Sequence, residues 1–200
     1  MPRPRVHAPD AVLDAAEELL VEQGRAQLTV RALAARSGAS NGSIYHAFGS
    51  LETVVGAAWL RRARQFLDLQ RAVVAEAGRD GRRAVQAAAD APARLAAREL
   101  RAAQLLFRLQ RDEVLTEAVT PEVADGLRAL DTALLDTLQL LARTVWGRDD
   151  GAAVGVVTAC VVRLPTALLL PEIRAGRVRP HTRSQLAAAV AAVVDCGLPS

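Results

Sequence analysis

The chain has 200 residues, a formal net charge of +3 and 51% hydrophobic residues. This hydrophobic fraction excludes a disordered chain, and the small net charge excludes a general polycationic coat for nucleic acid. Alanine and leucine dominate, and sustained alternation of β-branched with polar residues is nearly absent. We therefore expect an all-α protein of one or two domains.

Residues 1–8 are expected to form an N-terminal arm. Its two charged residues, Arg3 and Arg5, are separated by prolines and could reach phosphates or a minor groove. A tail without a binding role is the alternative. A first helix is expected to begin near Pro9 and to end at Gly24. Its inward stripe contains Val12, Leu13, Ala16, Leu19 and Leu20.

Residues 29–48 have the pattern of two short helices joined by a tight turn. Thr29 is expected to cap the first helix, Gly38 to end it, and Ser40 to cap the second. Ile44 and Phe48 lie four residues apart and should pack the second helix inward. The pattern predicts a helix-turn-helix whose second helix enters the DNA major groove. The face presented to DNA would contain Asn41, Gly42, Ser43, Tyr45 and His46.

The charge around this motif is locally basic. Residues 24–65 contain six arginines and one acid, Glu52, so the segment has a net charge of +5. Such a patch is expected of a protein that neutralises phosphates. Two short helices around a glycine also occur in all-α proteins that bind no DNA. The six arginines are Arg25, Arg31, Arg36, Arg61, Arg62 and Arg64.

We assign residues 1–53 to a helix-turn-helix domain, the head, and residues 54–200 to a helical ligand-binding and dimerisation domain, the body. Ser50 should cap a long helix that ends near Ala77, and the turn at 78–81 is expected to link head and body. Helices are then expected over 82–97, bent near Pro92, and over 99–111 and 121–146. The last of these has so wide an apolar stripe that we expect it to lie centrally.

The final third predicts two apolar helices, over 150–170 and 182–196. Arg163 and Pro165 interrupt the first of them, which argues against a bilayer span, and Pro165 should kink it. Both helices have few charges, and they either fill the body or form a subunit interface. In the second case Val161 and Val190 would face a partner. Cys160 and Cys196 are expected to be buried small side chains, with a redox pair, which no spacing supports, as the alternative.

The residues from the first helix to Glu52 resemble the N-terminal domain of the TetR family of bacterial transcriptional repressors. The resemblance rests on Leu28-Thr29-Val30, Ser37-Gly38-Ala39-Ser40, Gly42-Ser43-Ile44-Tyr45 and Phe48-Gly49-Ser50-Leu51-Glu52, and covers about 55 residues. It implies an all-helical homodimer with a three-helix DNA-binding head and a ligand-binding body. It also implies that the last two helices pair with those of a second subunit as a four-helix bundle.

Carried over by position, the resemblance implies that Asn41, Ser43 and His46 face bases and that Thr29 and Tyr45 hold phosphates. Two positions depart from the family pattern. Ala47 stands where His or Tyr is frequent, and Leu51 stands where a lysine is commonly aimed at a phosphate. The second departure should weaken anchoring to the backbone. Arg3, Arg5, Arg31, Ser40 and Gly42 complete the expected DNA-binding set.

The sequence favours a cytoplasmic repressor that binds a palindromic operator as a dimer and is released by a small apolar ligand. The alternatives are a regulator with no effector and a ligand-binding protein with weak DNA affinity. The expected pocket lies between residues 99–111 and 121–145, although ordinary core packing explains its leucines equally well. Its lining would include Leu105, Leu109, Leu134 and Leu138.

No motif indicates an enzyme. His7, His46 and His181 are far apart and lack the spacing of metal ligands. A glycine-rich phosphate loop and a nucleophile elbow are both missing from the sequence. We therefore expect no catalytic residues, no metal and no cofactor. The N-terminal Met-Pro-Arg-Pro-Arg has no apolar stretch of the kind that secretion signals carry.

Overall fold

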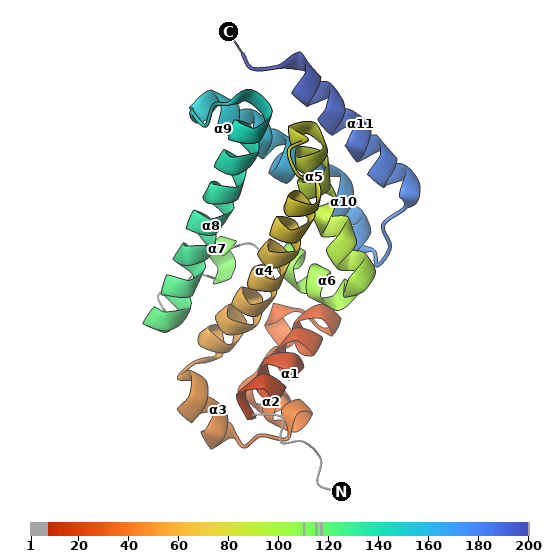
Figure 1. Cartoon of the computed structure of the whole chain (residues 1–200). Coiled ribbons are helices and arrows are strands. Elements are labelled where there is room, and N and C mark those ends of the chain that lie inside the picture. The colour runs from red at the N-terminus through yellow and green to blue at the C-terminus, as the bar shows by residue number, and fades with distance from the viewer. Residues whose placement is uncertain (1–7, 110, 115, 117, 200) are drawn as a thin grey trace, which may run out of the picture.

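The computed structural model describes residues 8–109, 111–114, 116 and 118–199. All regular elements within these residues are helical, which confirms the expected fold class. Figure 1 shows a small head at one end of an elongated body. Arg3 and Arg5 lie outside the described residues. The head contains α1 (Ala8–Glu22), the 3₁₀ turn η1 (Arg25–Gln27), α2 (Val30–Ser37) and α3 (Asn41–Phe48).

Helix α4 (Leu51–Glu76) belongs to both parts of the molecule. It is continuous over 26 residues, which corresponds to about 39 Å of length. Its first turns place Val54 and Ala58 in a cluster of buried head residues, the head core, together with Leu19, Leu33 and Ile44. Its later turns place Leu69 and Val73 in the much larger cluster inside the body, the body core. One rigid helix therefore connects the two cores.

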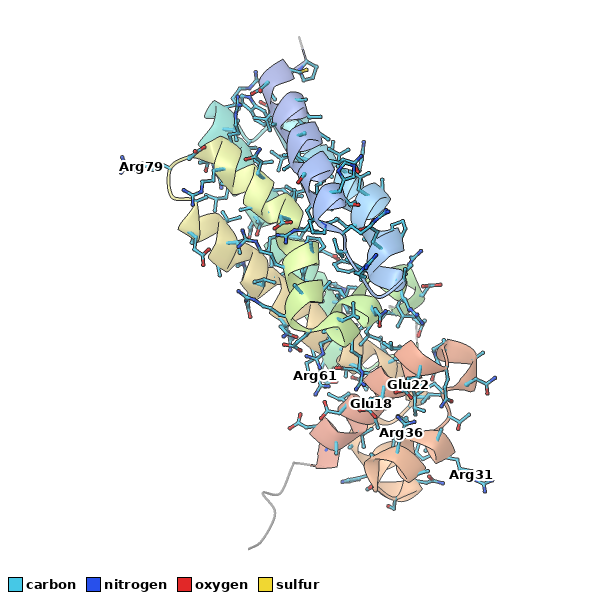
Figure 2. The ribbon with its side chains drawn as sticks, turned by 90° about the vertical axis from the view of Figure 1, so that its right-hand side faces the viewer. Glu18, Glu22, Arg31, Arg36, Arg61 and Arg79 are labelled. Carbon is cyan, nitrogen blue, oxygen red and sulfur yellow. The ribbon has the colours of Figure 1, made fainter. Side chains whose placement is uncertain are left out.

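The turn after α4 is not the link between head and body that we expected from its glycines. It lies at the end of the body remote from the head, where Figure 2 shows Arg79 projecting from the loop. Gly78 has φ of 64° and reverses the chain from α4 into α5 (Gly81–Arg98). A glycine-rich turn marks a change of helix direction, and here it joins the body end of α4 to α5.

The other elements of the body are α6 (Leu100–Arg108), α7 (Arg111–Val114), α8 (Pro121–Trp146), α9 (Gly151–Thr158), the π-helical η2 (Ala159–Arg163), α10 (Leu164–Arg174) and α11 (Pro180–Cys196). Most of them pack around α5. Alanines on several faces of this helix are fully buried, and α5 packs against α4, α6, α8, α10 and α11. The expectation that 121–146 is central is wrong: Leu135 and Leu140 of α8 are 46% and 49% exposed. The small side chains of α5 let these neighbours approach it closely.

Helix α8 crosses α4 close to the head. A Cβ at Gly56 would lie 2.8 Å from Val123, and one at Gly126 would lie 2.5 Å from Leu60, so the two glycines allow the close approach. Near the same end, the Ser50 hydroxyl donates to the Ala118 carbonyl at 2.8 Å. The base of α4 is therefore held by α8 as well as by the head.

Residues 151–174 form one uninterrupted helical run, in which Pro165 is accommodated by the π-helical turn before it. The Leu164 N–H donates to the Ala159 carbonyl five residues back, which widens the helix where the proline removes a donor. The run is long and apolar enough to cross a membrane, with a mean hydropathy of 2.0, but only 33% of its most apolar window is buried inside the chain. Its other face is left uncovered by the part of the subunit that the structure describes.

The loop between α10 and α11 is fixed by a single carboxylate. Glu172 accepts hydrogen bonds from the Arg179 backbone N–H and from the Thr182 hydroxyl, both at 2.7 Å. These bonds and the Arg179 guanidinium hold the pKa of Glu172 at about 2.

Of the two cysteines, Cys160 is buried as expected, and burial raises the pKa of its thiol to about 11. Cys196 is exposed, which corrects the second half of that expectation.

Candidate DNA-binding and ligand-binding sites

The turn between α2 and α3 has the local geometry that the sequence predicts. The Thr29 hydroxyl accepts from the Ala32 N–H at 3.1 Å and caps α2. Gly38 adopts φ of 75°, which only glycine takes without strain, and ends that helix. The Ser40 hydroxyl then accepts from the Ser43 N–H at 3.1 Å and caps α3. Three short-range signals thus set the angle between the two helices.

Helix α3 has one buried and one exposed face. Ile44 and Phe48 point into the head core, with 2% and 9% of their surfaces exposed. The side chains on the other face are exposed, and Tyr45 exposes 54% of its surface. Figure 1 places this helix at the end of the molecule, away from the body, where a DNA duplex can approach it. The exposed set contains Asn41, Gly42, Ser43, Tyr45, His46 and Ala47.

Most of the arginines that suggested a basic patch are engaged by acids, which corrects that part of the sequence analysis. Arg25 pairs with Glu52 at 3.1 Å. Arg36 pairs with Glu18 at 2.9 Å and with Glu22 at 3.3 Å, as Figure 2 shows in the head. The hydrogen bond from Arg36 holds the pKa of Glu18 below its ordinary value. Glu18 and Glu22 come from α1, which precedes the segment counted in the sequence, whereas Glu52 is the one acid inside that segment.

Arg31 remains available for phosphate. It is exposed on α2, forms no ion pair with any residue that the structure describes, and points outward from the head in Figure 2. Thr29 is exposed at the start of the same helix. Leu51, where the family pattern has lysine, is only partly exposed and packs against the head core. The charge on the described DNA-facing surface is therefore concentrated in Arg31.

A buried carboxylate joins the head to the body. Glu17 of α1 is 2% exposed and accepts from Arg61 at 2.5 Å and from Arg62 at 2.6 Å, both on α4. Arg62 also reaches Glu99, at the end of α5, at 2.9 Å. Arg101 of α6 pairs with Glu18 at 2.8 Å. Arg61 and Arg62 thus serve the contact between the two parts and not the DNA-binding surface.

The body contains an apolar cavity of about 310 Å³ between α4, α5, α6, α8, η2 and α10. The Phe66 and Phe107 rings meet edge to face in its wall, with centroids 5.6 Å apart. Asp131, Val162 and Thr166 are exposed lining residues and mark its opening. The other lining residues are Trp59, Ala63, Leu67, Gln70, Pro92, Leu106, Leu130, Leu134, Val161, Pro165 and Leu170.

Only one of the four leucines expected in a pocket lines this cavity. Leu134 does so, from α8. Leu105 is 1% exposed and belongs to the head core, against which Leu109 also packs. Leu138 is 6% exposed inside the body core. The cavity is displaced towards α4 and η2, because helical spacing identifies a buried face but not which buried residues leave space between them.

Helix α6 contacts both the head core and the apolar cavity. Leu105 lies in the head core, whereas Leu106 and Phe107, the next two residues, line the cavity. The Trp59 indole of α4, itself in the cavity wall, donates to the Leu106 carbonyl at 3.3 Å. The cavity wall and the head core are therefore adjacent along α6.

Comparison with known proteins agrees with this architecture. Residues 12–58 match the family model described as bacterial regulatory proteins, tetR family. No curated protein matches the chain in sequence. The fold matches a TetR-family transcriptional regulator from Streptomyces coelicolor, with 20% identity, a TM-score of 0.66, and 95% of this chain and 99% of that one covered.

Two further solved structures cover nearly the whole chain. A TetR-like transcriptional regulator from Rhodococcus has 18% identity and a TM-score of 0.66, covering 98% of this chain and all of that one. The fatty acid degradation regulator FadR from Bacillus halodurans has 18% identity and a TM-score of 0.66, covering 95% and 99%. The family consists of DNA-binding regulators and not enzymes, in agreement with the missing catalytic motifs. The head therefore matches the TetR family model, and the chain as a whole has the fold of TetR-family transcriptional regulators.

Proposed function

We propose that the protein is a cytoplasmic repressor that binds a palindromic operator as a homodimer and is released by a small apolar ligand. The head, residues 1–53, would read the operator, and the body, residues 54–200, would dimerise and bind the ligand. The observation that carries the proposal is the position of α6, which borders the apolar cavity with Leu106 and inserts Leu105 into the head core. A ligand that favours one arrangement of α6 would bias the position of the head.

The exposed face of α3 supports a division of labour between base and phosphate contacts. Asn41 is at the first position of the helix, where recognition helices approach base edges, and its amide can form a bidentate contact. The Tyr45 hydroxyl, one turn later, would donate to a phosphate. Arg31 of α2 would add a charged phosphate contact. These roles are proposals for the residues singled out in the sequence.

Asn41→Ala is expected to relax the preference for one base pair in each half-site, at a cost of about 1–3 kcal/mol for the preferred base. Tyr45→Phe, which removes only a hydroxyl, should weaken binding to all operator variants alike. Binding titrations of both proteins against single-base operator variants separate the two results. A uniform loss with Asn41→Ala would assign that residue to the backbone.

The uncovered face of residues 151–174, together with that of α11, supports a dimer through the last two helices. Small or apolar residues on this surface, such as Ala167, Ala188 and Ala192, are exposed in the single subunit. The sequence suggested that Val161 and Val190 would face a partner. Both instead lie in the subunit's own core, where 4% and 0% of their surfaces are exposed. We assign the apolar run to this interface and not to a membrane, since its other face packs within the body.

Filling the cavity tests the proposed ligand site. Leu134 is partly buried and lines the space, so Leu134→Trp should fold and bind operator but respond to the inducer at least about 10-fold more weakly. Leu135→Trp is the matched control, because Leu135 is the next residue on α8 and is exposed outside the cavity. It should respond as the wild type does. Normal induction of Leu134→Trp in an operator-release assay would place the ligand elsewhere.

A further inference from the structure

The cavity wall contains a buried amide, that of Gln70, whose orientation is fixed by its neighbours. This arrangement depends on a proline in α5. Pro92 lies inside α5 and lacks the N–H that would donate to the Ala88 carbonyl four residues earlier. Gln70 of α4 supplies the missing donor: its Nε2 lies 3.2 Å from the Ala88 oxygen. A carbonyl can only accept, so this contact fixes which end of the Gln70 amide faces α5.

The other end of that amide has no partner. Gln70 is 1% exposed, and its Oε1 atom is buried without a hydrogen bond to any residue that the structure describes. Reversing the amide would place oxygen against the Ala88 oxygen and leave both acceptors unsatisfied. A buried carbonyl oxygen without a donor costs free energy comparable to a lost hydrogen bond. Both Gln70 and Pro92 line the apolar cavity.

We propose that the effector is an apolar molecule that carries a hydrogen-bond donor, such as a hydroxyl or amide N–H, and that Gln70 Oε1 accepts from it. The inference rests on the proposed function, because it takes this cavity as the effector site. The surrounding wall of Phe66, Leu106, Phe107 and Leu130 offers apolar contact to the rest of the molecule. A small apolar pocket with one fixed polar group binds ligands in a defined orientation.

Two isomeric probes isolate the donor from size and composition. 1-Nonanol and 1-methoxyoctane have the same formula, but only the alcohol can donate a hydrogen bond. Calorimetric titration of the full-length protein should give an affinity for the alcohol about 10-fold higher than for the ether. In Gln70→Met, which keeps the length of the side chain without its acceptor, the ratio should fall to one or below. Gln86→Met, at a glutamine outside this cavity, should keep the wild-type ratio.

The outcomes separate this inference from the proposed function. Equal binding of both probes to the wild type would overturn the donor requirement and leave the apolar pocket standing. Binding of neither probe would remove the pocket itself, and the proposed ligand response with it. An undiminished preference in Gln70→Met would also overturn the assignment to Oε1. If that variant does not fold, the ratio measured with the wild type still decides whether a donor is required.

Discussion

A chain carrying Ala188→Glu and Ala192→Glu is expected to be a folded monomer that binds a palindromic operator at least about 100-fold more weakly than the wild type. Both alanines lie on the exposed face of α11, opposite Leu186 and Val190, which pack inside the subunit. Four carboxylates brought together across a two-fold interface would repel one another. Loss of the dimer removes the second half-site contact and the gain in effective concentration that comes with it.

Light scattering at micromolar concentration measures whether the protein is a monomer or a dimer, and operator titration measures its affinity for the palindrome. Ala72→Glu with Ala75→Glu is the matched control, because these alanines are exposed on α4 and not on α11. That protein should remain dimeric with normal operator affinity. A wild-type protein that is monomeric would contradict the dimer itself. A doubly substituted protein that remains dimeric would show that another surface joins the subunits.

Glu17→Gln is expected to lower the free energy of unfolding by about 2–4 kcal/mol. The carboxylate is 2% exposed and holds both Arg61 and Arg62, so its neutralisation leaves two guanidinium groups without their buried partner. The estimate is near the lower part of the range for breaking a buried pair, because Arg61 also reaches Asp14 and Arg62 also reaches Glu99. Denaturant unfolding with an unchanged slope measures the loss.

Glu52→Gln provides the comparison for that substitution. Glu52 and Arg25 form a pair in which both side chains are more than a third exposed, and such pairs contribute at most about 1 kcal/mol. If Glu17→Gln costs no more than Glu52→Gln, the buried carboxylate is not what holds α1 against α4. The head would then be held to the body by apolar packing, to which Leu105 contributes, and by the pair between Arg101 and Glu18.

Local signals made the head predictable from sequence. Thr29, Gly38, Ser40 and Ser50 each determine a helix end through a hydrogen bond or a backbone angle within a few residues, and all four act as expected. The buried spacing of Ile44 and Phe48 fixed which face of α3 is presented to solvent. Caps and helical spacing are properties of neighbouring residues, so no knowledge of the tertiary structure is needed to use them.

Long-range pairing was not predictable in the same way. The sequence showed Arg61 and Arg62 as part of a basic segment, but their partner Glu17 precedes them by more than 40 residues and lies across a helix interface. Likewise, apolar spacing showed that Leu105, Leu134 and Leu138 are inward-facing without showing that each faces a different place. The link between Gln70 and Ala88 depends on the packing of α4 against α5 and carries no local signal.

Selection of bound sequences from a random DNA pool tests the central claim most directly. The purified protein is expected to enrich a palindrome whose half-sites are one helical turn, ~34–36 Å, or a multiple of it apart, and Asn41→Ala should lose the preference at one position in each half-site. A pool that shows no enriched sequence, or a single half-site without symmetry, would contradict a dimeric repressor that reads DNA through α3.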